Sequence, residues 1–300
     1  MAEGNHIGVV SVTYNSANVL PEFLRCLSEQ TYRDFTLFAV DNASSDDSLR
    51  ILRDCFNPCA RILSNPNNRG VAAGNNQGIQ AALDAGCSSV LLINNDTAFD
   101  SGLIARLDQG LARHRVEMVC PKMMYYDQPD RIWTAGGTFQ KWRGYRSVHV
   151  GEGEPDNGQY DVARLVPYVP TCCVLIKKEV FTRIGMMDET YFVYWDDTDF
   201  MYRAMKAGVR LMYLPEAKLW HKVAALTGGP STPFAMRYGT RNSLYFLLKH
   251  FGIVLALPWL ALSQANWCRK AVLGRKPKSW FAMKQSAFRE SLAMWWKGNR

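Results

Sequence analysis

The alternation of short apolar runs with amphipathic segments constrains the fold more than any other feature of this sequence. Apolar runs, most of them rich in β-branched residues, occupy positions 7–13, 36–40, 61–63, 89–93 and 116–120. The segments between them space their apolar residues as helices do, at 16–30, 44–55, 70–85 and 101–114. Strands that are buried on both faces and joined by helices form a parallel sheet with right-handed crossovers. We therefore expect an α/β fold with a Rossmann-like, mostly parallel sheet flanked by helices.

The chain becomes less regular in its middle before the same pattern returns. Positions 125–169 hold Gly, Trp and Tyr among alternating segments, which favours a β-rich insertion. We expect further elements at 172–177 (strand), 178–184 and 197–207 (helices) and 210–214 (strand). Three hundred residues suit one large domain with an appendage. The expected division is a main domain over 1–225 and a helical, basic and aromatic C-terminal region over 226–300.

Gly70, Gly74 and Gly78 recur every four residues in the helix predicted at 70–85. Their spacing matches neither GxxxxGK[ST] nor GxGxxG, so this segment is not a phosphate loop of either familiar kind. Small residues on one helical face permit close approach to a neighbouring strand, and we expect that role here. The Asn-rich segment before this helix ends in Arg69, whose guanidinium suits a phosphate.

Polar residues follow three of the predicted strands at the point where each strand ends. They stand at 13–15 (Thr-Tyr-Asn), 41–42 (Asp-Asn) and 94–96 (Asn-Asn-Asp). Ligands of open parallel sheets bind outside the carboxyl ends of the strands, so this edge is the expected site. Asp96 supplies a hard oxygen ligand that suits Mg²⁺ or Mn²⁺ bridging a diphosphate. Asn-Asp-Thr is also good turn chemistry, which is the simpler interpretation of the same residues.

A second acidic cluster places Asp196, Asp197 and Asp199 within four positions. Three carboxylates at this spacing repel one another, so we expect a cation, a basic partner or a raised pKa. Asp197 and Asp199 also suit the first turn of a helix, where acids interact favourably with the macrodipole. His221 follows a predicted strand and is either a ligand for a metal or diphosphate or an ordinary hydrogen-bonded histidine.

The basic charge of the chain is concentrated at its C-terminal end. Residues 266–300 hold nine Lys and Arg against one acid, Glu290, and so carry +8, which equals the net charge of the whole chain. Five of the nine tryptophans lie in the last fifty residues, and one helical face gathers Phe281, Phe288, Leu292 and Trp295. Such a helix suits the headgroup region of a membrane. The alternative is an ordinary helix packed on the protein, and nucleic acid is not expected because the basic footprint extends no further.

Three further observations concern the cellular environment. The longest apolar run, 251–262, has twelve residues including Pro258, fewer than the about 20 that a membrane-spanning helix needs, so we do not expect it to span alone. The N-terminal sequence lacks a basic region followed by a long apolar one, so no signal peptide is expected. The eight cysteines form no CxxC pair, which argues against zinc and fits a reducing cytosol.

Six motifs occur in the order of one known family. They are VTYN (12–15), VDNASSDDS (40–48), NNRGVAAGNNQGI (67–79), LLINNDT (91–97), YFVYWDDTDFMYRAMKAG (191–208) followed by His221, and RYGTRNSLYFLLKH (237–250). Together these resemble the family-2 glycosyltransferases, and within them the rhamnosyltransferase-like branch that builds bacterial surface polysaccharides. The resemblance implies a GT-A fold, a metal-dependent nucleotide-sugar site and inverting sugar transfer.

On the donor side, the resemblance implies a nucleotide-sugar site formed by the first four motifs. Its residues would be Thr13, Tyr14, Asn15, Asp41, Arg69, Asn95 and Asp96. Asp41 would contact the base of the nucleotide. Asp96 matches the last Asp of the family's DxD-type element and would hold Mg²⁺ or Mn²⁺, with His221 as a candidate partner. Because the element here reads Asn-Asn-Asp, it offers a single carboxylate.

On the acceptor side, Asp197 matches the second acid of the family's Glu-Asp pair and would be the catalytic base. Asp196 takes the Glu position with a side chain one methylene shorter, and Trp195 precedes it. Asp196 and Trp195 would both face the acceptor. We expect the β-rich insertion and the Gly/Pro-rich segment at 227–233 to shape the acceptor site as well.

The resemblance further implies dTDP-rhamnose as donor and a lipid-linked, lipopolysaccharide or other polysaccharide acceptor. The enzyme would be cytoplasmic and peripheral on the inner face of the cytoplasmic membrane, bound through its tail. A UDP-sugar is the alternative donor. Two other interpretations are a nucleotidyltransferase, for which a Gly-rich basic loop is missing near residue 13, and an inactive relative that keeps the fold for assembly. Retention of Asp41, Asp96, Asp197 and His221 together argues against the last.

Overall fold

The computed structural model describes residues 5–55, 60–223 and 232–298 of the 300-residue chain. The chain divides into two compact units. Unit 1 comprises Met1–Phe139, Ser147–Phe192 and Asp196–Leu226, and unit 2 comprises Gln140–Arg146, Val193–Trp195 and Thr227–Arg300. Most of the Gly/Pro-rich segment at 227–233 lies outside the described residues.

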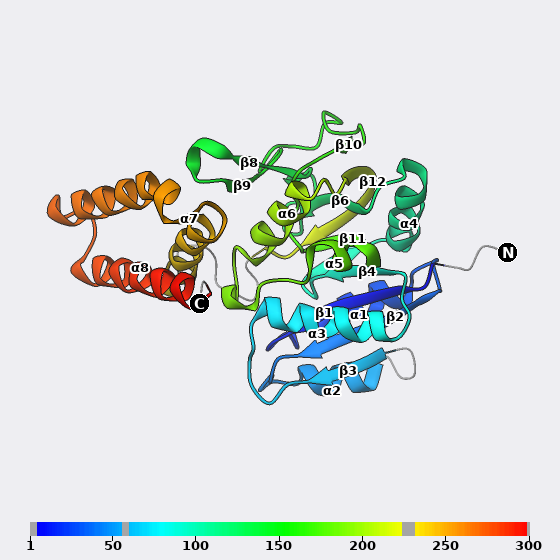
Figure 1. Ribbon diagram of the computed structural model, residues 1–300. Coiled ribbons are helices and arrows are strands. Elements are labelled where there is room, and N and C mark those ends of the chain that lie inside the picture. Colours follow the sequence, from blue (N-terminus) through cyan, green and yellow to red (C-terminus); the bar gives the residue numbers. More distant parts are fainter. Residues whose placement is uncertain (1–4, 56–59, 224–231, 299–300) are drawn as a thin grey trace. The chain divides into compact units, whose positions relative to one another are not determined.

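Unit 1 contains a ten-stranded sheet with helices packed on it (Figure 1). The sheet follows the order β10-β12-β6-β11-β4-β1-β2-β3, while β5 pairs with β12 and β7 pairs with β6. The strands of this sheet are β1 (Ile7–Thr13), β2 (Phe35–Asp41), β3 (Ala60–Ser64), β4 (Ser89–Ile93), β5 (Thr97–Phe99), β6 (Met118–Tyr125), β7 (Ile132–Thr134), β10 (Arg164–Leu165), β11 (Cys173–Lys177) and β12 (Leu211–His221). A separate two-stranded sheet joins β8 (Gly137–Gln140) to β9 (Arg146–His149).

Strand direction follows the predicted pattern with one main exception among the long strands. β1 is parallel to β2 and β4, β2 is parallel to β3, and β12 is parallel to β6. β11 runs antiparallel to both of its neighbours, β4 and β6. Four of its five residues are buried, like those of the parallel strands around it, so its hydrophobicity does not reveal its direction. The mostly parallel sheet and the β-rich insertion are confirmed.

The helices of unit 1 fall close to the predicted segments. They are α1 (Leu20–Ser28), α2 (Ser48–Cys55), α3 (Val71–Asp84), α4 (Leu103–His114), α5 (Lys178–Ile184) and α6 (Asp196–Lys206). α3 packs against β1 and β2, and α4 packs against β12 and β6. In α3, a Cβ atom added to Gly74 would lie 2.8 Å from Val12 of β1, and one added to Gly78 would collide with Val10. The glycines therefore serve the close helix–strand approach that the sequence predicts.

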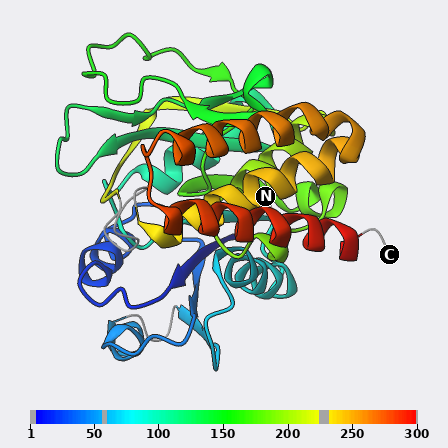
Figure 2. The ribbon, with the colours of Figure 1, turned by 90° about the vertical axis from the view of Figure 1, so that its left-hand side faces the viewer.

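Unit 2 is built from two long helices, α7 (Pro233–Val272) and α8 (Lys278–Gly298), which pack on each other (Figure 2). α7 is interrupted at Gly252, whose φ of 69° is not helical. Its buried side chains form a core against which α8 packs its aromatic and aliphatic side chains, and this core contains Leu244, Leu247, Leu248, Ala256, Leu260 and Trp267.

The packing of α8 bears on the membrane prediction for the C-terminal region. Phe281, Phe288, Leu292 and Trp295 share one helical face as predicted, but that face packs against the core of α7. The face is therefore partly covered by protein, in line with the alternative that the sequence left open, and its four side chains keep partial exposure. Exposed apolar side chains lie instead on α7, where Val254, Leu255, Leu257 and Leu262 are each more than half exposed.

α7 also differs from the expectation for the apolar run at 251–262. α7 extends on both sides of that run but breaks within it at Gly252. By length and composition alone α7 could cross a membrane, with a mean hydropathy of 1.7 in its most apolar 18-residue window. Only 28% of that window is buried in the structure. The short run thus belongs to a much longer helix than the sequence suggested.

The glycine packing predicts opposite effects for two helical glycines. We expect Gly78→Ala to lower the free energy of unfolding by ~1–3 kcal/mol, because the new methyl collides with Val10. Gly239 of α7 has open space where an added Cβ atom would lie, so Gly239→Ala should raise stability by about 0.5–1 kcal/mol through helix propensity. Urea denaturation of both variants checks this, and equal effects would contradict the packing argument.

Candidate active site

The carboxyl ends of β1, β2 and β4 bring the predicted donor-side residues together. Thr13 and Asp41 are register partners at the ends of β1 and β2. Asn95, in the turn after β4, donates from Nδ2 to the carbonyl of Val12 at 3.1 Å and to Oγ1 of Thr13 at 3.2 Å. Three segments that lie far apart in the sequence therefore meet at one edge of the sheet, as the sequence predicts.

Asp41 is buried at this edge with one carboxylate oxygen left to bind a ligand. Its Oδ2 accepts a hydrogen bond from the backbone N–H of Ser44 at 3.2 Å. Its Oδ1 has no hydrogen-bond partner among the residues that the structure describes, although the side chain is 1% exposed. A buried carboxylate oxygen of this kind calls for a donor from a ligand.

Tyr14 and Asn15 follow β1 on the open side of the same edge. The Tyr14 ring is 46% exposed. Asn15 adopts a positive φ of 49° and accepts from the backbone N–H of Ser45 at 2.8 Å through its Oδ1. This contact ties the end of β1 to the loop after β2. An exposed aromatic ring that directly follows the strand end at Thr13 suits stacking against a planar heterocycle.

Arg69 has a different environment from the other donor-side candidates. Its guanidinium lies 3.4 Å from the carboxylate of Glu189, and both side chains are about half exposed. It lines a cavity with Gln77 and Gln80 of α3. Within the described part of the chain, no hydrogen bond or ion pair joins Arg69 to Asp41 or Asp96. Its neighbour Gly70 accepts a hydrogen bond from Asn42 Nδ2 at 3.0 Å, so the backbone at Arg69 lies beside the strand-end cluster although its side chain pairs with Glu189.

Asp96 and His221 lie side by side at the end of the sheet. β5, which follows Asp96, pairs with β12 so that Thr97 is opposite His221. The backbone N–H of Lys222 donates to the carbonyl of Asp96 at 2.9 Å. His221 Nε2 then lies 3.2 Å from Asp96 Oδ1, close enough for an ion pair without the alignment of a hydrogen bond.

The charge state of this pair decides whether it can hold a divalent cation. Burial lowers the pKa of His221, but its neighbours Cys172 and Asp96 raise it, to about 10 overall. No group of three or more His, Cys, Asp or Glu that could hold a metal occurs among the described residues. Because of its raised pKa, His221 is protonated at neutral pH, so a divalent cation would bind here only by displacing that proton, with Asp96 as the carboxylate ligand.

The three carboxyl groups at the start of α6 (Asp196, Asp197 and Asp199) differ in how their mutual repulsion is reduced. Asp199 is fully buried and pairs with Arg203, whose Nε lies 2.8 Å from Asp199 Oδ2. Arg203 also donates to the carbonyls of Ile184 and Met186, so this ion pair holds the preceding loop in place. Asp199 is therefore a structural residue.

Asp197 is held by a tyrosine from the insertion. Tyr168 is buried, and its hydroxyl donates to Asp197 Oδ2 at 2.7 Å. The backbone N–H of Thr198 donates to Oδ1 at 2.6 Å. The Thr198 hydroxyl also donates to Oδ1 at 3.2 Å, so Oδ2, with Tyr168 alone, keeps a lone pair for a further donor. Asp197 is more exposed than Asp196, which is only 4% exposed.

Asp196 resolves the repulsion by keeping its proton. Burial and the charge of Asp197 raise the pKa of Asp196 to about 8. At neutral pH the two adjacent carboxyl groups therefore share one negative charge. The expectation of a basic partner or a raised pKa is confirmed, because Asp199 has the partner and Asp196 has the raised pKa.

Three residues of the insertion complete the site, and no sequence pattern pointed to them. The Trp133 ring lies 4.3 Å from the His221 ring and 4.8 Å from the His149 ring, centroid to centroid. His149 in turn stacks on Tyr168 at 6.2 Å. A continuous row of rings therefore connects His221 to the tyrosine that holds Asp197. Trp133 and His149 lie in an irregular segment without apolar periodicity, so the sequence alone did not identify them as site residues.

The protonation of Asp196 predicts a pH-dependent stability. A folded Asp196 holds its proton up to about pH 8, whereas the ordinary value is 3.8, so unfolding releases a proton between these values. Stability should therefore fall as pH rises from about 4 to 8.

Asp196→Asn, which mimics the protonated side chain, should remove part of this fall, while the exposed Asp127→Asn should leave it unchanged. Thermal midpoints at pH 5.5 and 8.0 test both variants. An Asp196→Asn protein with the pH dependence of the wild type would contradict the assignment.

Known proteins resemble this chain in sequence and in fold. The chain is 27% identical over 263 residues to an N-acetylglucosaminyl-diphospho-decaprenol L-rhamnosyltransferase of Mycobacterium tuberculosis, covering 81% of this chain and 85% of the relative. It is 22% identical over 265 residues to the dTDP-rhamnosyl transferase RfbF of Shigella flexneri, covering 84% of each. A mannosyltransferase from Pyrobaculum calidifontis in complex with GDP-Man and Mn²⁺ shares the fold, with a TM-score of 0.55 and 16% identity over 97% of this chain and 87% of that one.

A structure of S. aureus TarS with UDP-GlcNAc is similar at a TM-score of 0.56 and 17% identity, over 81% of this chain and 66% of that one. These neighbours share the GT-A fold that the motif order implied. The model of the family described as glycosyl transferase family 2 matches residues 8–185, which is more than half of the chain. With the strand-end cluster, the acidic pair and this match in agreement, the protein belongs to glycosyl transferase family 2.

Proposed function

We propose that this glycosyltransferase moves L-rhamnose from dTDP-rhamnose to a lipid-linked or polysaccharide acceptor, with inversion at the anomeric carbon. The observation that carries the proposal is the row of rings from His221 through Trp133 and His149 to Tyr168. This row links Asp96, beside His221, to Asp197, which accepts from Tyr168, so both carboxylates belong to one site. The rhamnosyl donor and the acceptor class are supported by the names of the two sequence relatives, which match over more than four fifths of this chain.

The donor's nucleotide would bind at the carboxyl ends of β1 and β2. Asp41 Oδ1, buried and without a described partner, would accept a hydrogen bond from the ring N–H of thymine or uracil. The exposed ring of Tyr14 would pack on the base, and Thr13 and Asn95 would fix the strand ends around it. Both pyrimidines carry the same N–H, so Asp41 accommodates the UDP-sugar alternative equally well.

Asp96 and His221 would hold Mg²⁺ or Mn²⁺ together with oxygens of the diphosphate. Bound there, the metal would stabilise the charge that develops on the departing nucleoside diphosphate. Arg69, whose guanidinium pairs with Glu189, would contribute to the donor site through the cavity that it lines with residues of α3.

Asp197 would take the proton from the attacking acceptor hydroxyl. Tyr168 and the backbone of Thr198 orient the carboxylate, since each donates to one of its oxygens. Asp196, protonated next to it, would donate a hydrogen bond and would keep a second negative charge away from the base. Trp195, the preceding residue, would contribute an aromatic surface for the acceptor.

The protein would act as a peripheral protein on the cytoplasmic face of the cytoplasmic membrane. The exposed apolar residues of α7 and the basic residues of the C-terminal region support this location.

The base assignment predicts a selective loss of turnover in Asp197→Asn. We expect kcat to fall by about 10²–10⁴-fold, because general-base help is lost, while donor affinity stays the same. Tyr168→Phe should lower kcat less, since it loosens the base without removing it. Steady-state kinetics with dTDP-rhamnose, together with calorimetric binding of the donor, would test this; near-normal turnover in Asp197→Asn would exclude it as the base.

The metal assignment predicts a requirement for a divalent cation. Dialysis against a chelator should abolish turnover, and Mn²⁺ or Mg²⁺ should restore it. Asp96→Asn and His221→Ala should each need at least about tenfold more metal for half-maximal activity, because each removes one of two protein ligands. Full turnover in the chelated enzyme would refute the assignment.

A donor screen separates the main proposal from its alternatives. Release of dTDP from dTDP-rhamnose supports the proposal, and release of UDP from a UDP-sugar identifies the alternative donor. The screen includes an extract of lipid-linked and polysaccharide acceptors. A nucleotide sugar that binds but is not turned over in its presence would identify an inactive relative.

A further inference from the structure

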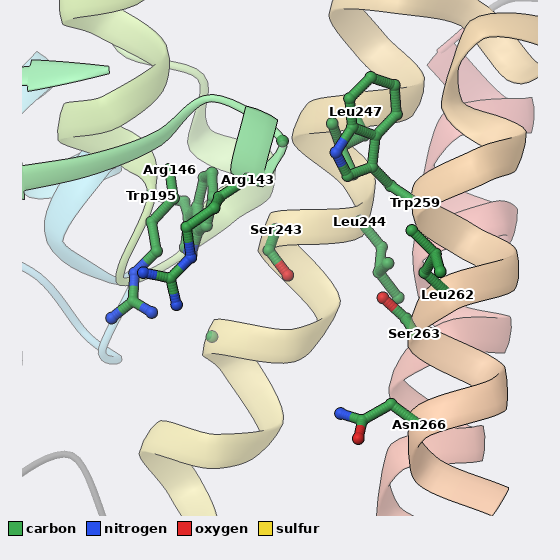
Figure 3. Close-up of a pocket in the computed structure, with 12 residues that line it drawn as sticks. Arg143, Arg146, Trp195, Ser243, Leu244, Leu247, Trp259, Leu262, Ser263 and Asn266 are labelled. Atoms are coloured by element: carbon green, nitrogen blue, oxygen red, sulfur yellow. The ribbon is translucent and has the colours of Figure 1, made fainter. Parts of the chain in front are cut away.

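Unit 2 contains a cavity of about 770 Å³ that is lined by none of the residues proposed for donor binding or proton transfer. Trp195, proposed above for the acceptor side, is among its lining residues. Every lining residue lies within unit 2. Three separate stretches of the chain form its walls: the segment at 140–146, the segment at 193–195, and α7. Figure 3 shows Arg143, Arg146 and Trp195 on one side of it and side chains of α7 on the other.

The polar wall carries two arginines on the short segment at 140–146. Arg143 and Arg146 both line the cavity, and both are exposed. Neither forms an ion pair with an acid among the residues that the structure describes; Arg143 has a 3.4 Å contact with Gln140 and a cation–π contact with Trp142. Two guanidinium groups without acidic partners suit the oxygens of an anionic ligand such as a phosphate, because their donor geometry matches the spacing of those oxygens.

This segment is fixed to α7, so the arginines have a defined position. The Tyr145 ring stacks on Phe251 with centroids 4.8 Å apart. Gly144, at a φ of 67°, lies so close to α7 that an added Cβ would be 3.3 Å from Leu247 and from Trp259. The segment therefore presents its arginines from a backbone that packs against the helix.

The opposite wall is apolar and reaches the surface. Leu244, Leu247 and Trp259 of α7 line it, and the first two belong to the buried core of unit 2. Leu262 also lines the cavity, yet it is 68% exposed. Leu262 thus connects the cavity to the exposed apolar residues of α7, which include Val254 and Leu255.

The charge of unit 2 fits an anionic amphiphile as well. Its sequence holds 15 Lys and Arg against one acid, Glu290, which gives a net charge of +14. A ligand that enters along Leu262 must therefore carry an apolar chain for the leucine wall and negative charge for the arginines. Lipids with a phosphate head have both properties.

We propose that the cavity in unit 2 binds a lipid through its phosphate head, with the phosphate between Arg143 and Arg146 and the start of the chain against Leu244, Leu247 and Trp259. Membrane glycerophospholipids and isoprenoid diphosphates share this chemistry. The site extends the proposed function with a lipid subsite, and it can be tested without donor or turnover.

The test measures calorimetric binding of three soluble probes to the full-length protein: farnesyl diphosphate, dioctanoyl phosphatidylglycerol below its micelle concentration, and inorganic pyrophosphate. We expect at least one amphiphile to bind about tenfold or more tightly than pyrophosphate, because only the amphiphiles reach the leucine wall. Preference for farnesyl diphosphate identifies an isoprenoid diphosphate as the ligand, and preference for the glycerolipid identifies a membrane lipid.

Two variants with matched controls locate the binding. Arg143→Gln/Arg146→Gln should weaken amphiphile binding by about tenfold or more, whereas Lys276→Gln/Lys278→Gln, which removes the same charge from exposed positions outside the cavity, should change it less than about threefold. Gly239 lines the cavity with open space around its Cβ position, so Gly239→Leu should block binding without a change of charge, and Gly239→Ala should not.

Equal losses in the two charge variants, or unchanged binding in Gly239→Leu, would overturn the proposal, as would amphiphiles that bind no better than pyrophosphate. Hydrolysis of the nucleotide sugar, measured separately in the same variants, reports on the proposed transfer reaction. A protein that turns over donor but fails the binding test rejects the lipid site alone.

Discussion

Buried polar atoms without hydrogen-bond partners gather where the strands of unit 1 end. Among the described residues they include Asp41 Oδ1 and His221 Nδ1, each on the last residue of a strand, and Asp96 Oδ1, in the turn between β4 and β5. An unpaired buried polar group costs about 1–3 kcal/mol, so a fold retains several at one edge when a ligand supplies the missing partners. The parallel pairing of β1, β2 and β4 brings these strand ends together, and the sheet's burial keeps water from them. The site depends on this shared edge.

The start of α6 shows how one short acidic sequence acquires three different properties. Asp199 is fully buried and pairs with Arg203, Asp196 is buried and protonated, and Asp197 remains accessible and is held by Tyr168. Identical side chains thus differ because of burial and neighbours alone. The separation also leaves one negative charge where a proton acceptor is needed, since the neighbouring carboxyl group is neutral.

Most of the fold and half of the site could be predicted from the sequence, for identifiable reasons. Strands such as β1 and β4 were predicted at their observed bounds because their apolar runs are buried on both faces. The direction of β11 could not be predicted, since a buried strand looks the same in either direction. Trp133, His149 and Tyr168 were missed because tertiary packing, and no periodicity, brings them to the site. The face of α8 was predicted correctly, but whether protein or lipid covers it depends on α7.

The division into two units also separates the charge of the chain. Unit 2 holds 15 of the 35 basic residues and one of the 27 acids, so unit 1 has 20 bases and 26 acids and a net charge of −6. The sequence isoelectric point of 9.1 is therefore an average that describes neither part. Molecules with such opposed parts attract one another through unlike ends when ionic strength is low, and at 0.1 M salt this attraction is largely screened beyond about 10 Å. We therefore expect moderate salt to increase the solubility of this protein, opposite to the behaviour of a uniformly basic protein of the same net charge.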